Sequence, residues 1–145
     1  MSDGAAARDL TLTRLGPGDL AIMRELNALF SAAFDEPENY SDRPPSDAYL
    51  ADWLAKPHIV ALAALSGAEV AGGLVAYQLE KFEQARSEIY IYDLAVAQAH
   101  RRQGVATALI EKTQAIAGEL GAWVVFVQAD HQDPPAIPLC QAGRA

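Results

Sequence analysis

The segment from residue 88 to residue 129 constrains the fold most, because strand and helix patterns alternate along it. Residues 88–96 have a strand pattern, and apolar residues at helical spacing follow over residues 104–120. Gly121 closes the helix, and residues 123–129 form a continuous apolar run typical of a buried strand. A strand, a crossover helix and a second strand make one βαβ unit. We therefore expect an α/β fold, a mixed sheet with helices on both faces.

The residues before this unit carry the patterns of a strand, two helices and a β-hairpin. These predicted elements cover residues 10–15, 19–34, 46–55, 59–65 and 69–82. The hairpin is necessarily antiparallel, and Gly72 and Gly73 in its second strand indicate a bulge or a close backbone approach. The expected order is β-α-α-β-β-β-α-β, followed by a Pro-rich, weakly structured tail over residues 130–145.

The chain of 145 residues is long enough for one packed domain, which we place at residues 10–145 after a flexible N-terminus of residues 1–9. No apolar run approaches the roughly 20 residues of a membrane span, and residues 1–9 lack the apolar core of a secretory signal. The single cysteine, Cys140, excludes an intrachain disulfide and a Cys-rich zinc site. We expect no metal site and a cytoplasmic location.

The net charge is −8, from 11 Lys and Arg against 19 Asp and Glu. A negative surface repels a phosphate backbone, so the composition argues against a nucleic-acid partner. It attracts cationic ligands, although the same charge also serves solubility.

The loop between the expected strand at residues 88–96 and the expected helix at residues 104–120 is the clearest candidate site. Gly104 stands at the start of the helix, where free N–H groups and the helix dipole favour an anion. Arg101 and Arg102 precede it and add donors that suit phosphate oxygens. This pattern indicates a pyrophosphate cradle, and the alternative is an ordinary loop with solvated arginines. It is neither a Walker A loop nor a G-x-G-x-x-G loop.

Arg-x-x-Gly-x-Ala after an apolar strand resembles motif A of the Gcn5-related N-acetyltransferases (GNAT family). The chain is most similar to aminoglycoside 3-N-acetyltransferases of the type I group, over roughly residues 10–137. The similar segments are residues 81–84, 86–96, 100–104, 106–110, 127–130 and 133–134.

The resemblance implies acetyl-CoA as co-substrate and a small polycationic amine as acceptor. The pantetheine arm would pair with the backbone of Leu94, Ala95 and Val96. The pyrophosphate would be held by Arg101, Arg102, Gln103, Gly104, Val105, Ala106 and Thr107. The strands ending at Val96 and near Gln128 would splay apart to admit the arm. The implied reaction is a direct attack of the amine in a ternary complex.

This reaction needs a base for the amine and a donor for the oxyanion. Asp93 is a charge within an apolar run beside the expected cofactor slot, so it is the candidate base or amine anchor; the alternative is a buried aspartate satisfied by backbone donors. Strict alternation would place Asp93 on one face with Ile89, Ile91 and Ala95. The backbone N–H of Leu94 is the candidate oxyanion donor. Glu88 and Asp130 are candidate substrate ligands, or else solvated strand-end charges.

The C-terminal end departs from the family pattern. Asp133 stands where relatives carry an Asn that contacts the cofactor, and Cys140 stands where they carry a Tyr that protonates the leaving thiolate. We therefore expect the last two strands of the family fold to be missing, with Cys140 as a substitute proton donor. Alternatives to an aminoglycoside acetyltransferase are a GNAT enzyme for another amine, such as a polyamine or peptide, or a weakly active acyl-CoA-binding remnant. An exposed sheet edge would favour a homodimer.

Overall fold

The computed structural model describes residues 10–127 and 137–141, so the expected flexible N-terminus lies outside the described residues. The elements are β1 (Leu10–Arg14), α2 (Leu20–Phe34), α3 (Pro37–Tyr40), α4 (Asp47–Ala55), β2 (Ile59–Ser66), β3 (Glu69–Glu80), β4 (Ser87–Val96), the 3-10 turn η1 (Gln98–His100), α5 (Val105–Leu120), β5 (Val124–Val127) and β6 (Ile137–Gln141). The predicted order is confirmed for β1 to β5 and the three long helices, and α3 is an added turn of helix between the two predicted N-terminal helices.

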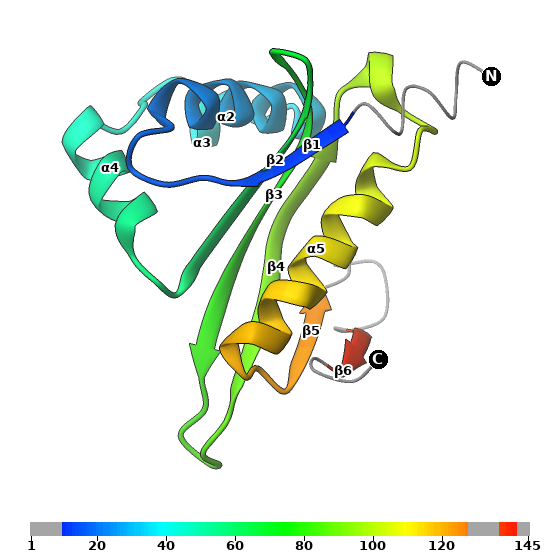
Figure 1. Cartoon of the computed structure of the whole chain (residues 1–145). Coiled ribbons are helices and arrows are strands. Elements are labelled where there is room, and N and C mark those ends of the chain that lie inside the picture. The colour runs from blue at the N-terminus through cyan, green and yellow to red at the C-terminus, as the bar shows by residue number, and fades with distance from the viewer. Residues whose placement is uncertain (1–9, 128–136, 142–145) are drawn as a thin grey trace.

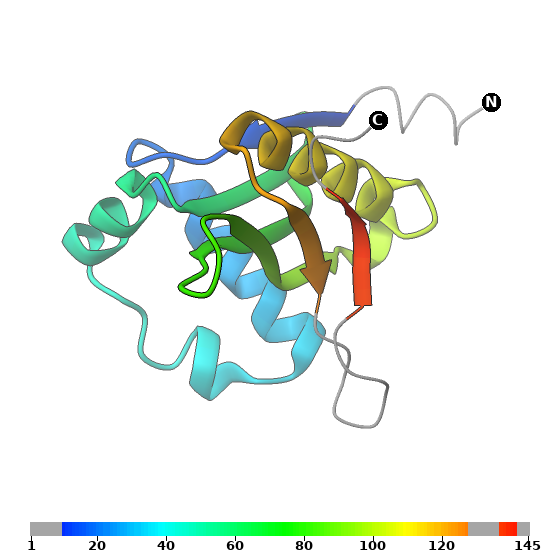
Figure 2. The same cartoon turned by 90° about the horizontal axis from the view of Figure 1, so that it is seen from below.

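The strands form one mixed sheet in the order β1-β2-β3-β4-β5-β6. Neighbours from β1 to β4 are antiparallel, β4 and β5 are parallel across α5, and β5 and β6 are antiparallel. Helix α5 covers one face of the sheet, and α2, α3 and α4 lie on the other (Figure 1). The view from below shows the same layers, with the sheet between the two groups of helices (Figure 2). The predicted mixed sheet with helices on both faces is confirmed.

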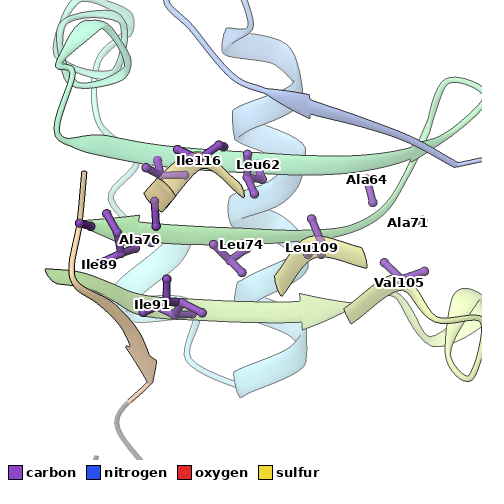
Figure 3. Close-up of a cluster of buried hydrophobic side chains, with 14 residues drawn as sticks. Leu62, Ala64, Ala71, Leu74, Ala76, Ile89, Ile91, Val105, Leu109 and Ile116 are labelled. Carbon is purple, nitrogen blue, oxygen red and sulfur yellow. The ribbon is translucent and has the colours of Figure 1, made fainter. Parts of the chain in front are cut away.

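Each face of the sheet has its own hydrophobic core. Under α5, Leu62, Leu74 and Ile89 are fully buried against Leu109 and Val105 of the helix (Figure 3). The opposite core consists of apolar residues from α2, α4 and the sheet. Its buried members are Leu15, Met23, Leu26, Phe30, Leu50, Leu54, Ala61, Ala63, Val75 and Ala95. These two cores hold α5 on one face of the sheet and α2 and α4 on the other. They therefore fix the N-terminus of α5 and the loops between α2 and α4 relative to the sheet.

A β-bulge in β4 overturns the predicted alternation. Val75 of β3 pairs with Asp93, but the next residue, Ala76, pairs with Ile91, so Tyr92 has no residue opposite it. Ile91 consequently packs in the core under α5, whereas Asp93, like its partner Val75, faces α2. The prediction that Asp93 shares a face with Ile89 and Ile91 is wrong, because one extra residue reverses the side-chain phase of a strand.

Gly73 marks a close approach between the sheet and α2, as the sequence predicted. A Cβ at this position would collide with the side chain of Leu26, which is fully buried. We expect Gly73→Ala to lower the free energy of unfolding by about 1–3 kcal/mol, because a packed core has no room for the added methyl. Denaturant unfolding measures the loss. Gly18→Ala is the control, since a Cβ there meets nothing within 4 Å; equal stability of the two variants would contradict the prediction.

The chain forms a strand at residues 137–141, where we expected a weakly structured tail. This strand, β6, pairs with β5, whose outer edge would otherwise leave its backbone N–H and C=O groups unpaired. Pro138 lies beside a register irregularity between Val125 and Phe126, a place where a sheet tolerates proline. The prediction of an irregular tail is wrong for these five residues, and the expectation that both final strands are missing is wrong as well, because a strand follows β5. None of the helices in the described residues is long and apolar enough to cross a membrane.

Candidate functional site

The predicted cradle lies at the N-terminus of α5, on a hollow of about 210 Å³. Seven residues line it: Val96, Arg101, Arg102, Gly104, Val105, Ala106 and Thr107. The structure therefore brings most of the predicted cofactor residues together. Leu94, Ala95 and Gln103 are not part of the lining, and Asp133 lies outside the described residues. Arg101 and Arg102 are exposed, so both guanidinium groups are accessible to a ligand.

The backbone of the cradle turns sharply to expose its N–H groups. Arg102 and Gly104 both have left-handed φ values, 65° and 80°. The C=O of Gly104 accepts the bond from Ala108, 3.0 Å away, and no side-chain hydrogen bond to the N-cap is found among the described residues. The N–H groups of the first turn thus have no intrahelical acceptor, and Val105, Ala106 and Thr107 of this turn line the hollow. A Cβ on Gly104 would meet nothing within 4 Å, so the space is open to an anion.

His100 connects the cradle to the sheet, a role that sequence reasoning missed. Its Nδ1 lies 3.3 Å from Oε1 of Gln103, and its Nε2 lies 3.3 Å from Oε1 of Glu69 at the start of β3. Gln103 therefore contributes to the shape of the loop through His100. In the sequence, His100 is notable only because it directly precedes Arg101 and Arg102, and this position does not reveal its contacts with Gln103 and Glu69.

Beyond the bulge, β4 offers a backbone edge toward β5. The described β4–β5 pairs end at Ile91 with Val127, while β4 continues to Val96. The N–H of Ala97, just after β4, donates to the C=O of Ala71 in β3 at 2.8 Å, so it points toward β3. Because N–H groups alternate in direction along a strand, those of Val96 and Leu94 point away from β3. This orientation is the one that pairing with an extended ligand requires.

A second cavity, of about 280 Å³, lies on the other side of the sheet, between β3, β4 and helices α2 to α4. Its lining is rich in aromatic residues, and it includes Asp93 and Arg43. The lining residues are Met23, Asn27, Phe30, Asn39, Tyr40, Arg43, Pro45, Tyr49, Leu50, Trp53, Val75, Tyr77, Tyr92 and Asp93. Tyr77 contacts both Trp53 and Tyr92 edge to face, with ring centroids 6.4 Å and 5.6 Å apart.

Asp93 is the half-buried carboxylate of this cavity. Burial raises the pKa of Asp93, and the charge of Glu36 raises it further. The Tyr40 hydroxyl, which donates to Oδ2 of Asp93 at 2.8 Å, opposes this rise. Sequence reasoning missed Tyr40 because it lies 53 residues away, in the segment between the two predicted N-terminal helices. A carboxylate with a raised pKa in a cavity is typical of a functional group.

The remaining predicted residues lie elsewhere. Glu88 is absent from the lining of the Asp93 cavity, and its Oε1 lies 3.6 Å from Nζ of Lys81. Asp130 and Asp133 fall outside the described residues. Cys140 belongs to β6, where its backbone pairs with Val125; its side chain is not described.

Comparison with known proteins now assigns the family. Residues 23–143 match the model of the acetyltransferase (GNAT) family, and the chain belongs to this family. No curated protein matches the sequence. The protein is thus a GNAT acetyltransferase that uses acetyl-CoA as co-substrate, in agreement with the prediction. The open, glycine-containing cradle with its two arginines fits the pyrophosphate of this molecule.

Among solved structures, an aminoglycoside acetyltransferase from an uncultured soil metagenomic sample is 52% identical, with a TM-score of 0.81; the match covers 84% of this chain and 80% of that chain. A second such enzyme from an uncultured soil sample, solved in complex with sisomicin, is 34% identical with a TM-score of 0.78, covering 87% and 81%. Arabidopsis thaliana NAA60, solved with acetyl-CoA, shares the fold at 16% identity and a TM-score of 0.57, covering 81% and 73%.

Proposed function

We propose that the protein transfers the acetyl group of acetyl-CoA to the 3-amino group of an aminoglycoside, by direct attack in a ternary complex. The observation that carries the proposal is the position of Asp93. Its carboxylate lies in the aromatic cavity, while the next residue, Leu94, belongs to the stretch of β4 that has no β5 partner among the described residues. Acceptor amine and thioester would therefore meet at the same stretch of β4.

The cradle and the cavity lie at a suitable separation for this arrangement. Val96 lines the cradle and Asp93 lines the cavity, three residues along one strand, which corresponds to about 10 Å. A pantetheine arm running along Val96, Ala95 and Leu94 would cover this distance from the pyrophosphate. Arg101, Arg102 and the first N–H groups of α5 would hold the pyrophosphate end.

The chemistry assigned to the side chains follows from the needs of amine acetylation. Bound acetyl-CoA supplies the acetyl thioester; the new N–C bond forms as the C–S bond breaks. Asp93 removes the proton of the ammonium group, directly or through water, so that the amine can attack. The Leu94 N–H stabilises the negative charge that develops on the carbonyl oxygen. The attacked nitrogen loses its second proton to water. The departing thiolate takes a proton from Cys140, which we keep as the proposed donor and which regains a proton from water.

The surroundings of Asp93 suit a polycation. The segment beside the cavity carries four exposed carboxylates, at Asp35, Glu36, Glu38 and Asp42. Such a group of negative charges concentrates and orients cationic ligands. The rings of Trp53, Tyr77 and Tyr92 provide faces for ammonium groups and saturated sugar rings. The sisomicin complex of the 34% identical enzyme adds support for an aminoglycoside. Glu88 and Asp130 remain proposed ligands for outer amines of a long acceptor.

We also propose a cellular location, an oligomeric state and a biological role for the protein. We place the protein in the cytoplasm, where acetyl-CoA is available, and we propose a homodimer. Acetylation removes a positive charge from an aminoglycoside and so would weaken its binding to an anionic target, which would confer antibiotic resistance.

A thiol-release assay tests the proposed reaction. The protein is incubated with acetyl-CoA and, separately, with sisomicin, gentamicin, spermidine and a peptide with a free N-terminus. We expect release with the aminoglycosides, and NMR of the product should place the acetyl group on the 3-amino nitrogen.

Release only with spermidine or the peptide would refute the aminoglycoside assignment. Calorimetric binding of acetyl-CoA without release for any acceptor would refute transferase activity and identify a binding remnant. Acetylation of another nitrogen would overturn the 3-N position alone.

A further inference from the structure

We propose that Tyr40 is a positioning residue, which holds the Asp93 carboxylate in the orientation that accepts the proton of the acceptor amine. This inference rests on the proposed function, because it concerns the same carboxylate. The Tyr40 hydroxyl donates to Oδ2 of Asp93 at 2.8 Å. In this arrangement Oδ1 is the oxygen that receives the proton.

The ring of Tyr40 is itself fixed by aromatic packing. Its centroid lies 5.9 Å from that of Phe30 and 5.9 Å from that of Phe34, and those two rings stack at 5.8 Å. Phe30 is fully buried in the core between α2 and the sheet. The three rings therefore connect the hydroxyl to a rigid part of the molecule, although Tyr40 comes from the short helix α3. Preorganisation of this kind avoids the cost of orienting a catalytic group during the reaction.

The hydroxyl also stays a donor over the working pH range. Burial raises the pKa of Tyr40 well above its ordinary value, and the hydrogen bond to Asp93 raises it further. Tyr40 therefore remains protonated wherever Asp93 titrates. A phenol that only donates can stabilise the carboxylate form of Asp93 but cannot take the amine proton itself.

The ionisation of Asp93 depends on opposing influences. Burial and the negative charge of Glu36 raise its pKa, and Tyr40 lowers it. Arg43, Tyr49, Tyr77 and Tyr92 complete the titratable groups that line the cavity in the described residues. Removal of the Tyr40 hydroxyl leaves burial and Glu36 unopposed, so the pKa of Asp93 should rise and the base should be ionised only at higher pH.

The decisive variant is Tyr40→Phe, which keeps the ring and removes only the hydroxyl. We expect kcat/KM for the aminoglycoside to fall about 10- to 50-fold at neutral pH, with KM for acetyl-CoA unchanged, because one hydrogen bond to a charged group is lost. The acidic limb of the pH profile should move to higher pH. In an Asp93→Asn background the same change should have little further effect, since Tyr40 acts through Asp93.

Ser41→Ala is the matched control from the same segment. It removes the contact of 3.1 Å between the hydroxyls of Ser41 and Ser31, which ties α3 to α2 without touching Asp93. We expect this variant to retain wild-type kinetics. A fall in Ser41→Ala equal to that in Tyr40→Phe would overturn the inference, because general tethering of α3 would then explain both.

Carbon-13 NMR of the Asp93 carboxyl gives a readout independent of turnover. Its titration should move to higher pH in Tyr40→Phe, and an unchanged titration overturns the inference even when the wild-type enzyme is active. A wild-type protein that acetylates no aminoglycoside overturns the proposed function, and the positioning role with it. An active enzyme with an unshifted profile in Tyr40→Phe overturns the positioning role alone.

Discussion

Asp93→Asn is expected to lower kcat for aminoglycoside acetylation by about 10²- to 10³-fold, the contribution of a general base. Asparagine has nearly the same shape and can still accept the hydrogen bond from Tyr40, but it cannot take a proton from the amine. The affinity for acetyl-CoA should stay within about twofold, because Asp93 is not part of the cradle lining. Steady-state kinetics and calorimetry measure the two effects. An unchanged kcat would remove Asp93 from the mechanism.

Asp93→Asn should lower activity but raise stability relative to the wild type at pH values where Asp93 is ionised. The pKa of Asp93 is raised in the folded protein, so the folded state holds its proton to higher pH than the unfolded chain does. The stabilisation from this group is therefore present at low pH and is lost as pH rises through the folded-state pKa. Wild-type Tm should fall relative to Asp93→Asn as pH rises from about 4, near the unfolded-state pKa, through the raised folded-state pKa. A wild-type Tm that gains on the variant over this range would contradict the raised pKa.

Gly104→Ala is expected to weaken acetyl-CoA binding by about 10- to 100-fold, or 1.4–2.7 kcal/mol. A side chain at a φ of 80° strains the turn, and the added methyl would project into the open space where the pyrophosphate is expected. Both effects displace the N–H groups that face the anion. Isothermal titration calorimetry with acetyl-CoA measures the loss.

Gly121→Ala separates the binding effect from backbone strain. Gly121 ends the same helix with a φ of 73°, and a Cβ there also meets nothing within 4 Å. Both variants should lose a similar free energy of unfolding, about 1 kcal/mol, but only Gly104→Ala should lose affinity. Equal affinities in the two variants would show that the cradle does not hold the pyrophosphate in the way described.

Local patterns predicted much of the fold and several of the residues that gather at the cradle. The βαβ unit, the hairpin and the cradle depend on residues close together in the chain, such as Arg101 and Gly104, and their patterns were sufficient. The strand β6 was not predicted, because its own residues carry no strand pattern and it forms by pairing with the edge of β5. The face of Asp93 was predicted wrongly because a bulge at Tyr92 leaves no clear pattern in the sequence.

The sequence by itself determined the order of elements from β1 to β5 apart from the short helix α3, the glycine turn at Gly104 and the negative charge of −8, since each follows from composition or from neighbouring residues. Only the tertiary structure decided that Asp93 faces an aromatic cavity and that Tyr40 is its partner. The hydrogen bond between them spans 53 positions and exists because the β4 bulge turns Asp93 toward α2, while Phe30 and Phe34 fix the ring of Tyr40 above it. Long-range packing of this kind sets the proposed acceptor site, whereas local backbone geometry sets the proposed cofactor site.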